Sequence, residues 1–129
     1  MKQYRNINNI TGWVVFVIAF SVYFLTMEPT VSWNDPGEHI ATSYKLQIGH
    51  PPGFPTFGLL GRIFSLLAFG NVEKVALMIN LMSVLASSFA ILFLFWTITI
   101  MARKMVSSGE DVSREQMWTI VASGFTGAL

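Results

Sequence analysis

The sequence contains no cysteine, and only 12% of its 129 residues are charged, which is about half of the share usual in soluble proteins. The absence of cysteine excludes disulfide bonds, thiolate metal sites and a cysteine nucleophile. A net charge of +1 leaves no polybasic surface of the kind that binds nucleic acid. Hydrophobic residues, in contrast, make up 53% of the chain, and its mean hydropathy is +0.55. These values exclude a disordered chain, a collagen-like fibre and a disulfide scaffold.

Two long segments without any charged residue indicate an integral membrane protein. They cover residues 11–27 and 75–102. The second would form a helix about 42 Å long at ~1.5 Å per residue, which exceeds the ~30 Å hydrocarbon core of a bilayer. Lys2 and Arg5 precede the first segment as in a signal peptide, but no small-residue cleavage site follows it. We therefore predict two uncleaved transmembrane helices, preceded by a short N-terminal segment, residues 1–10.

A third apolar run, residues 116–129, follows a polar loop at 103–115. We interpret this run as the start of a third transmembrane helix and the chain as the N-terminal part of a longer multi-pass protein. The second predicted helix also carries small residues at i, i+3, i+4 and i+7, a pattern typical of close helix packing in lipid. The stripe predicts a partner helix and consists of Ser83, Ala86, Ser87 and Ala90.

The distribution of basic residues predicts the orientation in the membrane. Five lysines and arginines lie before the first and after the second predicted helix, whereas the longer segment 28–74 between the helices contains three. The positive-inside rule therefore places the N-terminus and 103–115 in the cytoplasm and 28–74 outside the inner (cytoplasmic) membrane. A competing arrangement makes 54–69 a membrane-spanning helix. It would bury Arg62 at a cost of ~2.5–3.5 kcal/mol on insertion scales.

The outward segment opens with a carboxylate pair that has two interpretations. Asp35 is a good helix N-cap, proline suits the next position, and Glu38 completes a capping-box pattern. A helix is expected over residues 36–48, with Gly49 ending it. In the first interpretation the two carboxylates only cap this helix. In the second, a carboxylate at the membrane surface acts as a base or binds a metal.

A rigid turn and a second helix follow. Prolines fix the backbone after His50, and the turn is either a linker or a device that aims the imidazole at an anionic headgroup. Residues 54–69 predict an apolar helix with a narrow polar stripe centred on Arg62. The Arg62 side chain either extends to lipid headgroups or faces a polar cavity, where its planar fork would suit a phosphate.

Four short motifs in this order resemble the N-terminal region of one family. They are Glu28-Pro-Thr, Trp33-Asn-Asp-Pro-Gly-Glu38, Ala41-Thr-Ser-Tyr-Lys-Leu46 and Gly49-His-Pro-Pro-Gly53. The family comprises bacterial membrane proteins, common in Bacteroidetes, that were long known as a domain of unknown function. It is similar to the eukaryotic transmembrane-protein-260 type of protein O-mannosyltransferase. The resemblance covers essentially the whole chain.

This resemblance implies an all-α, multi-span bundle of the GT-C glycosyltransferase type with two juxtamembrane helices, 36–48 and 54–69, in the first outward loop. The implied reaction moves a sugar from a polyprenyl-phosphate donor to an acceptor hydroxyl of protein Ser or Thr. Asp35 and Glu38 lie where the family has its acidic catalytic motif, although the usual motif has adjacent acidic residues. Which carboxylate is the base therefore stays open.

The resemblance also implies binding partners. His50 and Arg62 would hold the donor phosphate, and His39 and Lys45 are additional candidates. No metal ligands are assigned, and a requirement for a divalent metal stays open. The expected partners are membrane lipid, the lipid-linked sugar, a protein acceptor and further transmembrane helices of the full-length chain.

Two other functions fit the composition less well. A transporter component should carry charges inside its spans, and both predicted spans lack them. A non-catalytic anchor or assembly subunit would suit the stripe of small residues but not the density of polar residues in the outward segment.

Overall fold

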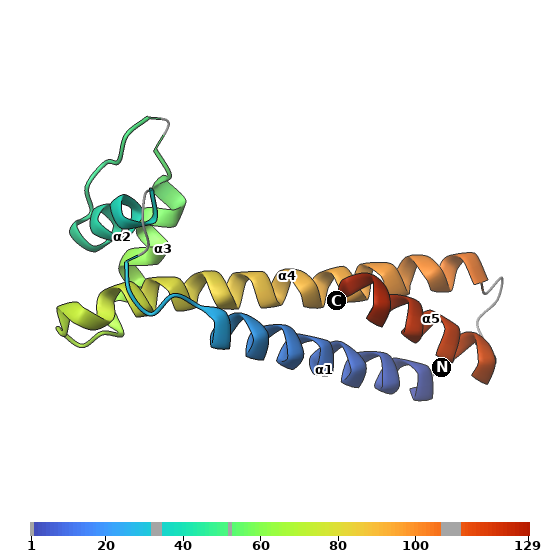
Figure 1. The fold of residues 1–129 in the computed structure, drawn as a ribbon. Coiled ribbons are helices and arrows are strands. Elements are labelled where there is room, and N and C mark those ends of the chain that lie inside the picture. Colours follow the sequence, from blue (N-terminus) through green and yellow to red (C-terminus); the bar gives the residue numbers. More distant parts are fainter. Residues whose placement is uncertain (1, 32–34, 52, 107–111) are drawn as a thin grey trace. The chain divides into compact units, whose positions relative to one another are not determined.

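The structure is a computed structural model that describes residues 2–31, 35–51, 53–106 and 112–129. The described part contains helices and no β-strand (Figure 1), which confirms the expected all-α class. The elements in chain order are α1 (Lys2–Thr26), α2 (Asp35–Lys45), α3 (Pro55–Leu66), the 3₁₀ helix η1 (Val72–Lys74), α4 (Val75–Val106) and α5 (Arg114–Ala128).

Two helices are long and apolar enough to cross a membrane, as the sequence predicts. They are α1 and the continuous helical stretch Val72–Val106, and only 17% and 28% of their most apolar windows are buried. A helix in the core of a soluble protein would be mostly buried, so this exposure favours lipid contact. Both helices extend beyond the predicted apolar segments, because polar residues end the hydrophobic run without breaking the backbone hydrogen bonds.

Helix α3 is too short to form a third span. Its 12 residues would cover about 18 Å at ~1.5 Å per residue, compared with the ~30 Å of the hydrocarbon core. The competing arrangement, in which residues 54–69 cross the membrane, is therefore not supported.

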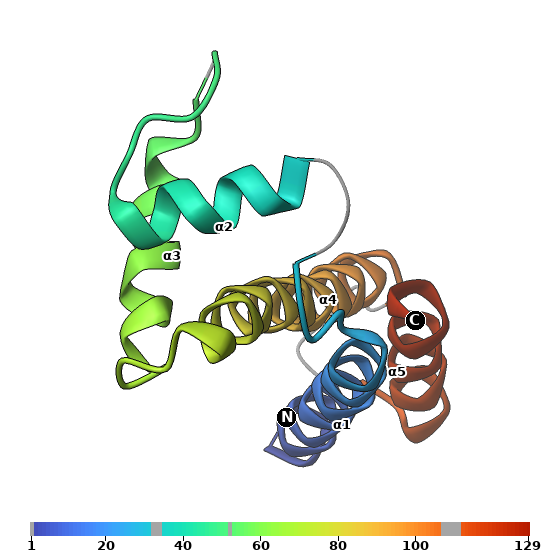
Figure 2. The ribbon, with the colours of Figure 1, turned by 60° about the vertical axis from the view of Figure 1, so that its left-hand side comes forward.

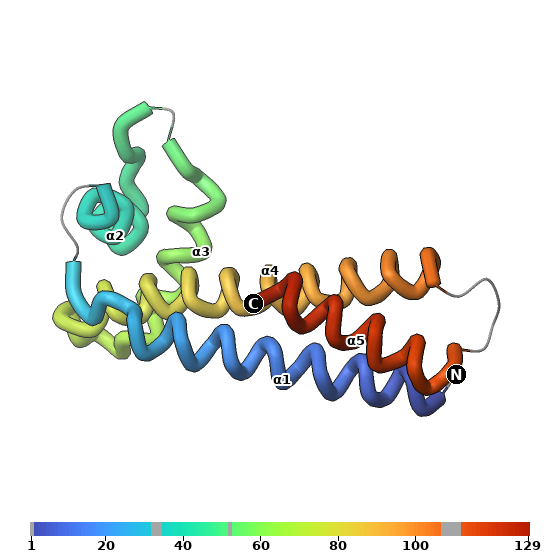
Figure 3. The backbone as a smooth tube through the Cα atoms, turned by 45° about the vertical axis from the view of Figure 1, so that its right-hand side comes forward, coloured from blue at the N-terminus to red at the C-terminus, as the bar shows by residue number. Residues whose placement is uncertain are grey.

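The chain divides into two compact units, and the first consists of Met1–Tyr23 and Ala86–Leu129. Within it, α1, the later part of α4 and α5 run alongside one another (Figure 3). Isolated glycines allow the close approach: a Cβ on Gly12 of α1 would lie 3.2 Å from the Phe95 ring, and one on Gly124 of α5 would lie 3.0 Å from the same ring. The buried residues of this unit include Tyr4, Val15, Phe95, Met117, Ile120 and Ala128.

The predicted stripe of small residues on α4 does not mediate this packing. All four of its members are exposed: Ser83, Ala86, Ser87 and Ala90. The partner helix predicted nearby is therefore not found among the described residues. Close packing depends instead on single glycines of α1 and α5 against large side chains of α4, a pattern without sequence periodicity.

The second unit is Phe24–Leu85, and it holds every candidate site residue. Helices α2 and α3 cross within it (Figure 2), with Ser43 of α2 packed directly on Gly61 of α3. Asn80 of α4 donates hydrogen bonds to the carbonyls of Glu28 and Thr30 and so ties the chain after α1 to α4. The buried cluster of the unit is Ile40, Ala68, Val75, Ala76 and Ile79.

Helix α2 ends four residues before the predicted terminator, Gly49. Leu46 adopts a positive φ of 51°, and the next residue, Gln47, donates its N–H to the Thr42 carbonyl, while the Leu46 N–H reaches the Ser43 carbonyl. These bonds form the left-handed Schellman ending that glycine usually provides. The prediction that Gly49 ends the helix was wrong, because Leu46 takes the left-handed conformation three residues earlier.

Candidate functional site

The centre of the candidate site is a pair between Glu38 and His50. One carboxylate oxygen of Glu38 accepts the backbone N–H of His50 at 2.7 Å, and the other lies 2.6 Å from the imidazole Nδ1. A Cβ on Gly49 would lie 3.1 Å from the Glu38 Oε1 atom, so the small residue lets the turn approach the carboxylate. The structure thus brings together one predicted catalytic residue and one predicted phosphate ligand.

This pair lowers the pKa of Glu38. The first cause is the hydrogen bond from the His50 backbone N–H, and the second is the bond to the His50 side chain. Both favour the ionised carboxylate, because a hydrogen bond to the charged form stabilises it. Because both oxygens of Glu38 bond to His50, this carboxylate is placed to hold the imidazole rather than to accept a proton from a substrate.

Asp35 is the first residue of α2 and is exposed. The sequence had predicted it as the residue before the helix, with Glu38 reaching back to complete a capping box. That capping-box prediction was wrong for Glu38, because both of its oxygens bond to His50. The residue preceding the helix lies outside the described residues. Since residues three apart share a helix face, Asp35 lies about one turn before Glu38 on the same side of α2.

Arg62 forms a hydrogen bond with the C-terminal end of α2. Its Nη1 donates a 2.7 Å hydrogen bond to the Tyr44 carbonyl, and its guanidinium carbon lies 5.4 Å from the centre of the Tyr44 ring. A cation at a helix C-terminus is favourable, because the last carbonyls lack partners within the helix. Tyr44 and Glu38 are six positions apart on α2, or about 9 Å along the axis. The structure therefore does not join Arg62 and His50 in one phosphate site.

His39 and Lys45 occupy different surroundings. The His39 ring packs edge-on against the rings of Phe54 and Phe57, at centroid distances of 5.1 and 5.6 Å. Lys45 is the exposed last residue of α2, where its charge favours the helix terminus. Among the described residues, no group of three acidic or histidine side chains is arranged to hold a metal ion.

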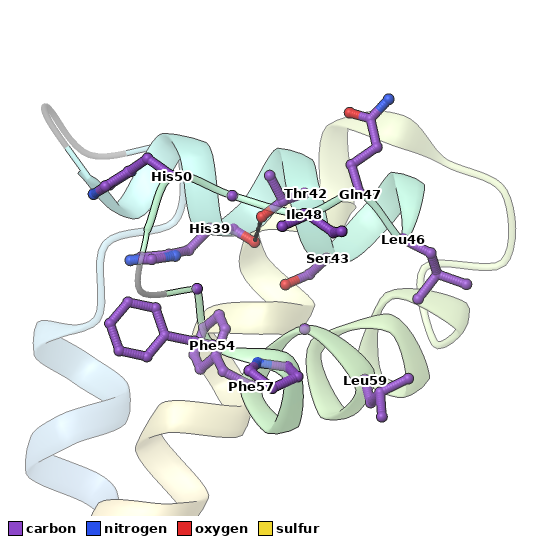
Figure 4. A pocket seen from close by; sticks show the side chains of 14 residues that line it. His39, Thr42, Ser43, Leu46, Gln47, Ile48, His50, Phe54, Phe57 and Leu59 are labelled. Atoms are coloured by element: carbon purple, nitrogen blue, oxygen red, sulfur yellow. Dashed lines mark hydrogen bonds between the residues drawn. The ribbon is translucent and has the colours of Figure 1, made fainter.

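A cavity of about 560 Å³ lies between α2, α3 and the segment that joins them. Figure 4 shows His39, Phe54 and Phe57 together on one side of it, with Ser43 on the neighbouring wall. Ser43 is fully buried, and its hydroxyl has no hydrogen-bond partner in the described part of the chain. Polar lining also comes from Thr42, Gln47 and His50.

Sequence reasoning missed the residues that shape this cavity. Phe54 and Phe57 carried no motif, Ser43 stood in the motif Ala41–Leu46 without an assigned role, and the contact of Gly61 with α2 was not predicted. Asn80 was included within an apolar span, although it holds the chain after α1 to α4. A lone asparagine in an otherwise apolar helix was the one signal that could have revealed such a contact.

Comparison with known proteins gives consistent results. Residues 35–129 match the family model of the protein O-mannosyl-transferase TMEM260 N-terminal domain. The chain is 36% identical over 85 residues to protein O-mannosyl-transferase tmem260 of Dictyostelium discoideum and 35% identical over 85 residues to protein O-mannosyl-transferase TMEM260 of Mus musculus. These matches cover 66% and 65% of the chain but only 10% and 12% of the two relatives. No solved structure gives a significant match.

Proposed function

Because the chain belongs to the family of the protein O-mannosyl-transferase TMEM260 N-terminal domain, we propose that it contributes the acidic site of a membrane glycosyltransferase of the GT-C type. The donor is a polyprenyl-phosphate-linked sugar, mannose by analogy with the relatives' names, and the acceptor is a Ser or Thr hydroxyl of a protein. The chain is a membrane protein with two candidate spans. Its outward loop, residues 28–74, carries the site on the side opposite the cytoplasm.

The observation that carries this proposal is the Glu38–His50 pair one helical turn after Asp35, within the segment that the family model covers. A carboxylate bonded to Nδ1 fixes the orientation of an imidazole and directs its other nitrogen, Nε2, outward. Asp35 lies in the first turn of α2 and is exposed, so an acceptor hydroxyl can approach its carboxylate. The two side chains thus supply a base and an oriented group for the phosphate.

In the proposed reaction Asp35 accepts the proton of the acceptor hydroxyl as its oxygen attacks the anomeric carbon of the sugar. The bond between that carbon and the phosphate oxygen breaks, and the polyprenyl phosphate leaves with the bonding electrons. In its imidazolium form, with Nδ1–H bonded to the Glu38 carboxylate, His50 donates a hydrogen bond from Nε2 to the leaving phosphate and stabilises its charge. Arg62 supports this arrangement by fixing the far end of α2.

The test is sugar transfer by the protein expressed from its natural gene and carrying Asp35→Asn. Asparagine is nearly isosteric and suits a helix start as well as aspartate does, so folding is kept while the base is lost. We expect transfer to slow at least ~100-fold, the lower range for general-base assistance. Glu28→Gln removes another carboxylate of the outward loop, one that contacts Thr30, and should leave the rate unchanged.

Two outcomes would change the assignment. If Asp35→Asn stays active while Glu38→Gln is inactive, the base is Glu38. If both variants transfer sugar at the normal rate, neither carboxylate is catalytic, and the pair serves only to hold the turn after α2.

A further inference from the structure

The cavity between α2 and α3 has the size and lining of a ligand site. Its volume of about 560 Å³ falls within the ~300–1,000 Å³ typical of small-molecule sites, which are lined mostly by apolar and aromatic groups. Phe54, Phe57 and the His39 ring form an aromatic wall. Ser43 of α2 also lines the cavity, but its hydroxyl is buried against Gly61 of α3.

The rim of the cavity is apolar and exposed. Ile48 is 96% exposed, and Leu46, Phe54 and Leu59 are also exposed at the rim. The outer face of α3 extends this surface through Ile63 and Leu66, one and two turns beyond Leu59. Soluble proteins rarely expose contiguous apolar surface of this kind unless a membrane or another molecule covers it.

The connection to α4 puts this surface beside the bilayer. After α3 a short turn leads through η1 (Val72–Lys74) directly into α4, the more apolar candidate span. Phe69, at the tip of that turn, is 92% exposed. Because only a few residues separate the end of α3 from the start of a candidate span, we expect the apolar face of α3, and the rim that continues it, to lie at the membrane surface.

We propose that the cavity binds a single hydrocarbon chain of a membrane lipid, which enters from the bilayer over the apolar rim. The aromatic wall of Phe54 and Phe57 packs against the chain. An isoprenyl chain and a fatty acyl chain share the chemistry that this cavity recognises. The inference depends on the cavity and its place at the membrane and does not require the transfer reaction.

The test is protection of a cysteine introduced into the wall. The chain has no native cysteine, and a side chain at Gly58, which lines the cavity, would meet open space, so Gly58→Cys should fold normally. In maltoside detergent we expect farnesyl phosphate or lysophosphatidic acid, at about ten times its dissociation constant, to slow maleimide labelling about tenfold. Protection by one probe alone identifies the chain type that the cavity binds, and protection by both shows that it binds either kind of hydrocarbon chain.

The control is Ile63→Cys, an exposed position on the same helix that does not line the cavity. Unchanged labelling of Gly58→Cys with both probes would overturn the proposal, and so would equal protection of the two cysteines, which indicates nonspecific partitioning. A second variant, Leu59→Cys with Gly58→Phe, places a ring in the cavity and should lose the protection seen with Leu59→Cys alone. Sugar transfer is measured separately, so failure of the transferase proposal and failure of the lipid-binding proposal are distinguishable.

Discussion

The crossing of α2 and α3 leads to a prediction with opposite signs at two glycines of one helix. A Cβ on Gly61 would lie 2.8 Å from the Ser43 hydroxyl oxygen and 2.9 Å from the Ser43 Cβ, whereas a Cβ on Gly58 would meet nothing within 4 Å. The same substitution, glycine to alanine, therefore tests the contact against a matched position three residues away. Gly61→Ala should destabilise the second unit, Phe24–Leu85, and Gly58→Ala should stabilise it.

The magnitudes follow from two opposing effects. Replacing glycine by alanine inside a helix gains about 0.5–1 kcal/mol, because the unfolded chain loses conformational freedom. Overpacking a buried contact costs about 1–3 kcal/mol, because neighbouring atoms must shift. Gly58→Ala shows only the gain. Gly61→Ala shows both effects, and since Ser43 is fully buried and cannot move aside freely, the net loss should be about 1–2 kcal/mol.

The assay is the reaction rate of a buried cysteine at position 68 with a thiol reagent. Ala68 is 4% exposed and belongs to the buried cluster of the same unit, so Ala68→Cys reacts only when the unit opens. A loss of 1–2 kcal/mol increases the open population about 5–30-fold. We expect that increase with Gly61→Ala and a decrease with Gly58→Ala, each measured in the Ala68→Cys background.

A third variant isolates the contact. Ser43→Gly with Gly61→Ala moves the side chain from α2 to α3 and should restore part of the stability, with a coupling energy of about 0.5–3 kcal/mol. If Gly61→Ala reacts no faster than Gly58→Ala, or if Ser43→Gly leaves the effect of Gly61→Ala unchanged, the close packing of these two helices is refuted.

Three further predictions concern the ends of α2 and the orientation in the membrane. Because the pKa of Glu38 is lowered from 4.5, its contribution to the turn should be complete above about that pH and lost as the pH falls through the lowered value. The chemical shift of the His50 backbone N–H reports this loss, and a shift that does not titrate in acid would contradict it. Arg62→Leu should lower the free energy of protection of the backbone N–H groups at the C-terminal end of α2 by about 1.5–3 kcal/mol, the value of a hydrogen bond from a charged donor. Hydrogen exchange measures this change, and unchanged exchange would show that the bond contributes nothing. For orientation, Val31→Cys should react only with a membrane-impermeant reagent on the outer side and Val106→Cys only from the cytoplasm, and the reverse pattern would invert the topology.

The helices could be predicted from the sequence because their signals are local. Uncharged runs at 11–27 and 75–102 marked both candidate spans, and two shorter helices were expected between them. The ends of α2 and α3 were less predictable, because Leu46 and Phe69 take positive φ values that side chains other than glycine rarely adopt. In this unit the helix ends depend on tertiary contacts that no short motif encodes.

The sequence could predict which residues belong to the candidate site, but not which of them contact one another. Asp35, Glu38 and His50 stood out as titratable groups near a membrane, but the sequence paired Glu38 with the start of its own helix. The structure pairs it with a residue twelve positions later, because the turn after α2 folds back along that helix. Arg62 and His50 were grouped by chemistry, and the structure bonds them to different ends of α2.

Because of these pairings, the direction of the Asp35 carboxylate depends on the orientation of α2. The helix is held near its start by the Glu38–His50 pair, in its middle by the Ser43–Gly61 contact and at its end by the bond from Arg62 to the Tyr44 carbonyl. Asp35 precedes all three attachments, so a change at any of them alters the direction of its carboxylate without removing it. On the proposed role of Asp35 as the base, variants of Gly61 or Arg62 should slow transfer through misplacement of its carboxylate, since small errors in position cost much of the rate. Substrate concentration should not restore that rate, which separates a misplaced base from a weakened substrate site.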